Sequence, residues 1–179
     1  TVRYKIFNAP LVSDRKHGKI TPMHLPEQDL RSRVDLLGAV RKDVGIDLTA
    51  AEVIVAVGRG VKNRKDLPLV ETLAGRIGAA MACTRPLTEN GWFDPRQQIG
   101  LSGRTVSPRL IITVGVSGSV QFVAGMKGSE TIVAINTDPQ AGIFNVAHHA
   151  FVGDWTEILP GLIERIGAAG RNHFPKPVR

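Results

Sequence analysis

The sequence has one cysteine, Cys83, and few aromatic residues. A single cysteine excludes an internal disulfide framework and is typical of a reducing compartment. Aromatic side chains make up 5% of the residues, so a flat ligand would rest mainly on aliphatic side chains, arginine or backbone. No apolar run approaches the ~20 residues of a membrane-spanning helix, and no secretory-signal pattern opens the chain. We therefore expect no membrane insertion.

The positive charge is concentrated in the terminal segments rather than in the glycine-rich body. The formal net charge is +7, and residues 1–65 hold 13 Lys and Arg against 7 Asp and Glu. A nucleic-acid groove needs cations clustered on one face with stacking aromatics among them, and the sequence lacks that pattern. We expect no nucleic-acid partner.

The length fits one domain with an irregular segment before it. Residues 1–51 mix charges, prolines and isolated apolar residues, and we expect them to form a connecting segment or arm. Within that segment, residues 29–48 predict an amphipathic helix from apolar positions at helical spacing: Leu30, Val34, Leu37, Val40 and Val44. Residues 52–170 form the expected domain, and residues 171–179 the expected flexible tail. The chain begins with Thr1 rather than Met, so we expect a piece of a longer protein.

From residue 52 onward, short apolar runs alternate with amphipathic stretches. The apolar runs predict strands at 52–58, 80–84, 109–115, 130–136 and 150–154. The stretches between them predict helices at 67–81, 117–126 and 154–170, the last bent at Pro160, and a short helix or turn within 141–150. This alternation specifies an α/β fold, a Rossmann-like parallel sheet with helices on both faces. Ligands of such sheets bind outside the carboxyl ends of the strands.

Polar or cationic residues follow each predicted strand. Arg59 lies between two glycines and suits an anion, although a solvated turn explains it equally well. Arg85 comes at the end of the second strand. After the third strand we expect Ser117 to be a helix N-cap, with glycines that allow close approach of a phosphate or make a tight turn. Asn136 could bind a polar group or make an Asx turn, and Asp154 could cap a helix or accept from a ligand.

Other chemistry is sparse. The dinucleotide fingerprint G-x-G-x-x-G and the phosphate loop G-x-x-x-x-G-K-[ST] are both missing. Cys83 has no adjacent histidine, so a buried structural thiol is favoured over a nucleophile. His148 and His149 would point to opposite faces of a strand, which does not suit joint metal ligation. The residues favour a protein that holds a ligand, without catalytic residues or a metal.

Three long blocks carry a resemblance to a known family. They read "VGRGVKN", "TRPLTENGWFDPRQQIGLSGRTVSPRLIITVGVSGSVQFVAGMKGSETIVAINTDP" and "IFNVAHHAFVGDWTEILPGLIERI". In order and spacing they resemble the C-terminal FAD-binding domain of the electron transfer flavoprotein alpha subunit. The resemblance runs from about residue 52 to 166. In the family a further domain normally precedes this one, so we expect this chain to be a C-terminal piece of such a protein.

The resemblance implies a flavoprotein that binds FAD as cofactor and pairs with a beta subunit as a heterodimer. It would carry electrons from a donor dehydrogenase, such as one acting on acyl-CoA, to a downstream acceptor without catalytic turnover of its own. Arg85 would lie against the flavin ring and Ser102 would point at flavin N5, while Ser117 and the amides after it would receive the pyrophosphate. The full set of cofactor contacts implied by the resemblance is Arg59, Thr84, Arg85, Ile99, Gly100, Leu101, Ser102, Ser117, Gly118, Ser119, Val120, Gln121, Phe122, Asn136, Asp154 and Trp155.

Three positions depart from the family pattern. Thr84 replaces a serine, and Leu101-Ser102 replaces glutamine-threonine, so both hydroxyls are kept. Phe122 stands where the family has a histidine that donates toward flavin O2. Because phenylalanine cannot donate, we expect a less stabilised anionic semiquinone, or another donor in place of the histidine.

Two other functional classes stay open. One is an NAD-binding enzyme of the related fold, which would need a catalytic base or lysine in the cleft. The other is a flavin-free interaction domain. We expect a bacterial cytoplasmic protein, or one of the mitochondrial matrix if the source is eukaryotic.

Overall fold

The computed structural model describes residues 19, 21–26, 34, 37–39 and 47–168. The helix expected over 29–48 lies mostly outside these residues. Its described members at 34 and 37–39 are not helical, and Val34 and Leu37 are exposed. Leu48 is buried in the core, so the folded unit already includes it.

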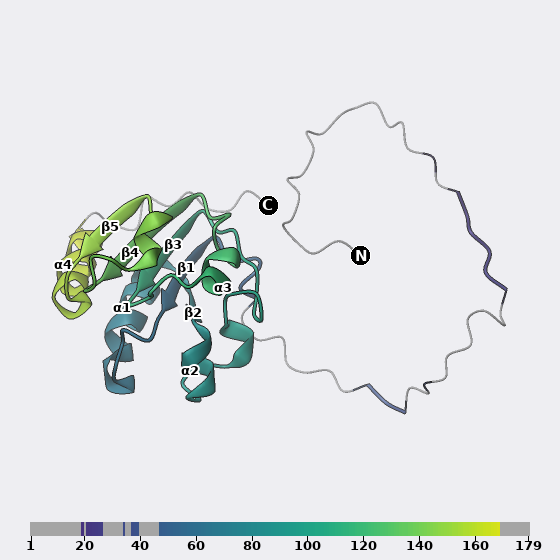
Figure 1. Cartoon of the computed structure of the whole chain (residues 1–179), viewed down its shortest axis with the longest axis horizontal. Coiled ribbons are helices and arrows are strands. Elements are labelled where there is room, and N and C mark those ends of the chain that lie inside the picture. The colour runs from purple at the N-terminus through teal and green to yellow at the C-terminus, as the bar shows by residue number, and fades with distance from the viewer. Residues whose placement is uncertain (1–18, 20, 27–33, 35–36, 40–46, 169–179) are drawn as a thin grey trace.

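Five strands form one wholly parallel sheet (Figure 1), which confirms the expected fold class. The strands are β1 (Val53–Val57), β2 (Ala80–Cys83), β3 (Leu110–Val114), β4 (Thr131–Asn136) and β5 (His149–Val152). Their order is β2-β1-β3-β4-β5, a common arrangement of doubly wound sheets. The chain therefore turns in opposite directions from β1 and from β3, and the point between these two strands is where such sheets bind ligands.

The helices predicted at 67–81 and 117–126 are shorter in the structure. The helices are α1 (Leu67–Ile77), α2 (Arg85–Glu89), α3 (Val120–Ala124) and α4 (Trp155–Ala168). Helix α1 ends before the predicted residue 81 because Gly78 takes a left-handed conformation, with φ of 66°, that caps it. Helix α4 continues through Pro160. Within 141–150, the short element is a 3₁₀ turn at Gly142–Asn145.

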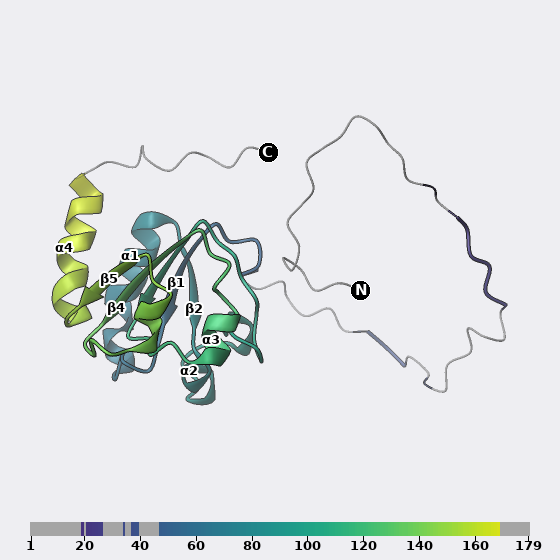
Figure 2. The ribbon, with the colours of Figure 1, turned by 45° about the horizontal axis from the view of Figure 1, so that its top comes forward.

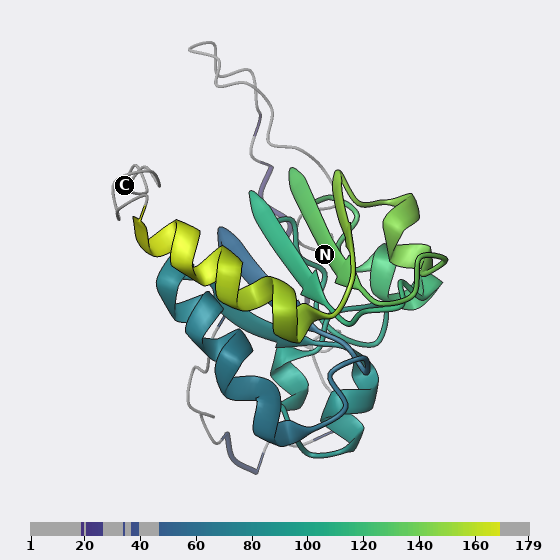
Figure 3. The same cartoon turned by 90° about the vertical axis from the view of Figure 1, so that its left-hand side faces the viewer.

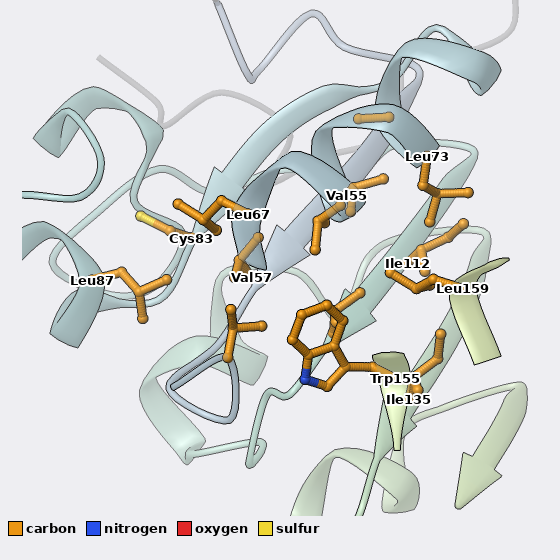
Figure 4. Close-up of a cluster of buried hydrophobic side chains, with 14 of the residues drawn as sticks. Val55, Val57, Leu67, Leu73, Cys83, Leu87, Ile112, Ile135, Trp155 and Leu159 are labelled. Atoms are coloured by element: carbon orange, nitrogen blue, oxygen red, sulfur yellow. The ribbon is translucent and has the colours of Figure 1, made fainter. Parts of the chain in front are cut away.

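Two hydrophobic clusters cover the two faces of the sheet. On one face α1 and α4 lie side by side (Figure 3), and their apolar side chains pack on Val55, Ile112 and Ile135. Figure 4 shows Trp155 within this cluster, close to Leu159. On the other face Phe122 of α3 and Ile143 pack on Ile54, Ile111 and Ala134. Since side chains alternate along each strand, helices on both faces are required to cover them.

Figure 2 shows α3 lying on the other side of the sheet from α4. The part of the chain that the structure describes contains no helix long and apolar enough to cross a membrane.

Candidate functional site

Three glycines allow the loops after β1 and β3 to pack closely against each other, at the point between the two strands where the chain direction reverses. The backbone N–H of Gly58 donates to Val114 O at 2.8 Å, and that of Gly60 donates to Gly115 O at 2.8 Å. A Cβ on Gly60 would lie 2.7 Å from the Cα of Gly115, and one on Gly58 would overlap its carbonyl oxygen. Gly115 itself has a φ of 63°. No larger residue fits at Gly58, Gly60 or Gly115, which together we call the glycine crossing. Arg59, between the first two, is exposed.

The loop from β3 to α3 differs from the prediction in its helix cap. Ser119, not Ser117, is the N-cap of α3, and its Oγ accepts from the backbone N–H of Phe122 at 3.4 Å. The prediction of Ser117 as N-cap was wrong because Gly118 has a φ of 82°, which excludes it from the helix. A Cβ on Gly118 would overlap the backbone nitrogen of Ile143. Ser117 therefore lies outside the helix, where it is exposed in the loop at the carboxyl edge of the sheet.

A cavity of about 310 Å³ lies beside this loop, between α2, α3 and residues 99–102. Its volume is at the lower end of the range of roughly 300–1,000 Å³ that is typical of small-molecule sites. Nine of the residues implied by the resemblance line it together with Pro86: Thr84, Arg85, Ile99, Gly100, Leu101, Ser102, Ser119, Gln121 and Phe122. Segments far apart in sequence thus meet as expected.

Backbone hydrogen bonds hold the wall of the cavity. Gly100, with a φ of 139°, donates to Arg104 O at 3.1 Å, and Leu101 donates to Gln121 O at 3.0 Å. The Cβ of any other residue at 100 would lie 3.1 Å from Gln121 O. Residues 99–102 are therefore tied directly to the start of α3.

Arg85 and Phe122 face the cavity in different ways. Arg85 is exposed, and its Nε lies 2.8 Å from Oε1 of Glu89 one helical turn later. Sequence reasoning missed this partner, although the spacing of four residues is a known helix pair. The side chain of Phe122 is 3% exposed and also belongs to the core cluster on that face.

The remaining predicted residues lie outside the cavity, mostly along the same edge of the sheet. Arg59, Ser117 and Gly118 follow β1 and β3, Asn136 ends β4, and Asp154 follows β5. The step from β2 to β5 covers four strand spacings, about 19 Å. An elongated ligand that starts in the cavity could follow this edge. Two of the predicted contact residues are placed differently from the rest. The Val120 side chain is exposed to solvent. The Trp155 side chain is buried in the core, so only its backbone could contact a ligand.

Asn136 and Asp154 both have structural roles. Asn136 Nδ2 donates to Val116 O at 2.8 Å, and its Oδ1 accepts from the N–H of Asp138 at 3.0 Å, which confirms the Asx turn. Oδ1 of Asp154 accepts from both N and Oγ1 of Thr156 at 2.8 Å, which confirms the helix cap. These hydrogen bonds and the nearby Lys62 hold the pKa of Asp154 below its ordinary value. Each side chain keeps further hydrogen-bonding capacity for a ligand.

Two polar residues behind the cavity were missed. Gln98 is 8% exposed, and its Nε2 donates to Ser102 Oγ at 2.9 Å. Thr88 Oγ1 lies 2.9 Å from Gln98 Oε1. The spacing of Asp94 and Gln97, which form a capping box, is a sequence signal for the 3₁₀ turn before Gln98. Nothing in the sequence shows that the Gln98 side chain points inward.

Cys83 is fully buried, and burial raises the pKa of its thiol to about 12. This confirms a structural thiol rather than a nucleophile, because the thiolate is the reactive form. The described residues contain no group of three or more potential metal ligands.

The parallel sheet with this strand order is of the doubly wound α/β class, and the glycine crossing and the cavity lie at the carboxyl edge, where such sheets bind nucleotide cofactors. The family model described as the electron transfer flavoprotein FAD-binding domain matches residues 47–127. The chain belongs to the electron transfer flavoprotein alpha-subunit family and contains its FAD-binding domain.

Curated relatives support this assignment. The chain is 54% identical over 172 residues to the lactate dehydrogenase (NAD(+),ferredoxin) subunit LctC of Acetobacterium woodii, covering 96% of this chain and 41% of that protein. It is 39% identical over 174 residues to the electron transfer flavoprotein subunit alpha of Clostridium acetobutylicum, covering 94% of this chain and 51% of that protein. It is 37% identical over 170 residues to protein FixB of Azorhizobium caulinodans, covering 94% of this chain and 46% of that protein. The chain thus spans about half the length of these relatives or less.

Proposed function

We propose that this chain binds FAD along the carboxyl edge of its sheet and carries electrons as the alpha subunit of an electron transfer flavoprotein. The observation that supports this most is the cavity, because residues from three separate segments that the family resemblance implicates line it together. The glycine crossing packs the loops after β1 and β3 against each other at the point of the sheet where doubly wound folds bind nucleotides, which supports the same placement.

The proposed contacts follow the parts of FAD in order along the edge. The flavin ring would occupy the cavity beside Arg85 and Ser102. The pyrophosphate would meet the amides of residues 117–119 and the cation of Arg59, and the adenosine end would meet Asn136 and Asp154. FAD, when bound, supplies reversible electron storage. Arg85 would place a positive charge beside the bound flavin and would favour its reduced form, because reduction adds negative charge. Glu89 offsets part of that charge.

The electron-carrier role includes partners. We propose a beta subunit as heterodimer partner and a dehydrogenase as electron donor, with no turnover by this chain alone. The donor class extends beyond acyl-CoA dehydrogenases, because the relative in Acetobacterium woodii is named as a lactate dehydrogenase subunit. The bacterial sources of the relatives support a bacterial cytoplasmic setting.

The test is a titration of the purified chain with FAD, followed by flavin fluorescence and absorbance, with and without a beta subunit. We expect saturable binding at one FAD per chain. Arg59→Gln should weaken this binding, while Arg76→Gln, an exposed change on α1, should not. If the chain binds no FAD either with or without the beta subunit, the proposal is overturned and a flavin-free interaction domain is favoured. Reduction by NADH without a partner favours the NAD enzyme.

A further inference from the structure

Three polar side chains form a hydrogen-bonded row that leads from α2 to the cavity. Thr88 on α2 contacts Gln98, and Gln98 contacts Ser102 in the cavity wall, each at 2.9 Å. Gln98 is buried and does not line the cavity itself. Of the three, Ser102 alone can touch a ligand there, and Gln98 acts on the ligand through it.

The row has two complete hydrogen-bonding arrangements because Thr88 has a choice of acceptor. Its Oγ1 lies 2.9 Å from Gln98 Oε1 and 2.7 Å from the carbonyl oxygen of Arg85. A hydroxyl carries one proton, so it donates fully to one of these oxygens at a time.

In the first arrangement Thr88 donates to Gln98, and Gln98 Nε2 donates to Ser102. The Ser102 proton is then free to point into the cavity. In the second, Thr88 donates to Arg85 O, and the Gln98 amide is turned by half a rotation. Gln98 Nε2 then donates to Thr88, and Ser102 donates to Gln98 Oε1. The two ends of a carboxamide are nearly equal in shape, so the turn requires no repacking.

We propose that Gln98 is a positioning residue that reverses the hydrogen bond of Ser102 to match the oxidation state of the flavin. This inference rests on the proposed function. Oxidised flavin has an N5 that only accepts, so Ser102 donates to it in the first arrangement. Two-electron reduction by the donor dehydrogenase leaves a proton from solvent on N5, which then donates to Ser102 in the second arrangement. Gln98, Thr88 and Ser102 gain and lose no proton overall.

Gln98→Glu fixes one direction of the row. An ionised carboxylate only accepts, so Ser102 must donate to it and can only accept from a ligand. The contribution through Ser102 should then shift the ratio of the dissociation constants for oxidised and reduced FAD about fivefold toward the reduced form, the value of one net hydrogen bond. The added negative charge acts in the opposite sense, since it opposes the anionic reduced flavin.

A double-mutant cycle separates the two effects. Oxidised and anaerobically reduced FAD are titrated against Gln98→Glu with Ser102 intact and with Ser102→Ala. We expect the shift toward the reduced form to depend on Ser102 by about fivefold. An equal effect of Gln98→Glu in both backgrounds overturns the proposal, because it leaves only the charge effect.

Gln98→Met is the matched apolar variant. It leaves the Ser102 hydroxyl free to donate or accept, so both affinities should fall by a similar factor and their ratio should stay within about twofold of the wild type. A shift of about fivefold toward the reduced form in Gln98→Met contradicts the proposal, and this comparison with the wild type decides the question if Gln98→Glu fails to fold. A wild-type chain that binds no FAD instead defeats the proposed function itself.

Discussion

At the scale of single residues, Phe122 is the position where the family resemblance implies the largest departure, a phenylalanine in place of a histidine. Its ring fills the space between the cavity and the core, where it is buried against apolar side chains. An imidazole would fit a similar space but would bring a donor to the cavity wall. The same position therefore controls both packing and the polarity offered to the flavin.

Phe122→His should increase the fraction of one-electron-reduced flavin during a redox titration followed by absorbance. The imidazole can donate toward the flavin, whereas the phenyl ring cannot. The variant should also lose about 1–3 kcal/mol of stability, because a polar ring enters an apolar cluster. Phe122→Leu is the control, since it changes packing and adds no donor. A similar increase in Phe122→Leu would rule out the donor as the cause.

Cys83 leads to a prediction on pH. The folded-state pKa of about 12 lies above the ordinary value of 9.0 because burial disfavours the thiolate. The folded state therefore keeps a proton that the unfolded state loses between these values, so stability should fall as pH rises through this window. A thiol reagent at pH 8 should react only after denaturant is added. Rapid labelling of the folded chain would show that Cys83 is accessible.

At the scale of elements, α4 depends on the cap at its start. Asp154 accepts two hydrogen bonds from Thr156 there and lies beside Lys62, which precedes α1. The cap thus sits where α1 and α4, the pair that covers one sheet face, both begin.

Asp154→Ala should lower the midpoint of thermal unfolding by a few degrees, since N-cap removal exposes unpaired backbone donors. Asp154→Asn should lower it much less, because asparagine caps equally well. The pKa of Asp154 is lowered in the folded state, so the stabilisation by its charge is present above the unfolded pKa and lost as pH falls through the folded one. The difference between wild type and Asp154→Asn, measured by circular dichroism, should therefore vanish in acid. Equal midpoints for all three proteins at neutral pH would contradict this role of the cap.

At the scale of the whole molecule, the sequence predicted the sheet and the edge that carries the site. Continuous apolar runs such as residues 110–114 fix buried parallel strands, and glycines at their ends mark the close crossings. Helix limits were less predictable. Ser117 and Ser119 both resemble caps in sequence, and only the left-handed backbone at Gly118 decides between them.

What the sequence could not predict depends on contacts between distant segments. Gln98 turns inward because Thr88 and Ser102 are both within reach, and the pairing of Arg85 with Glu89 depends on α2, a helix that was not anticipated. Glycine spacing suggested a phosphate turn, but the wall of the cavity beside it involves a contact between distant segments, in which the backbone N–H of Leu101 donates to Gln121 O. Such relations are properties of the folded molecule rather than of any one motif.

The course of α4 has a practical consequence. The helix starts at the carboxyl edge and runs back along the sheet beside α1, on the flank formed by β4 and β5. It ends far from the cavity beside β2. Immobilisation of the protein on an electrode through an anchor placed after α4 would therefore leave the cavity facing the solution, where the proposed flavin could exchange electrons with added partners.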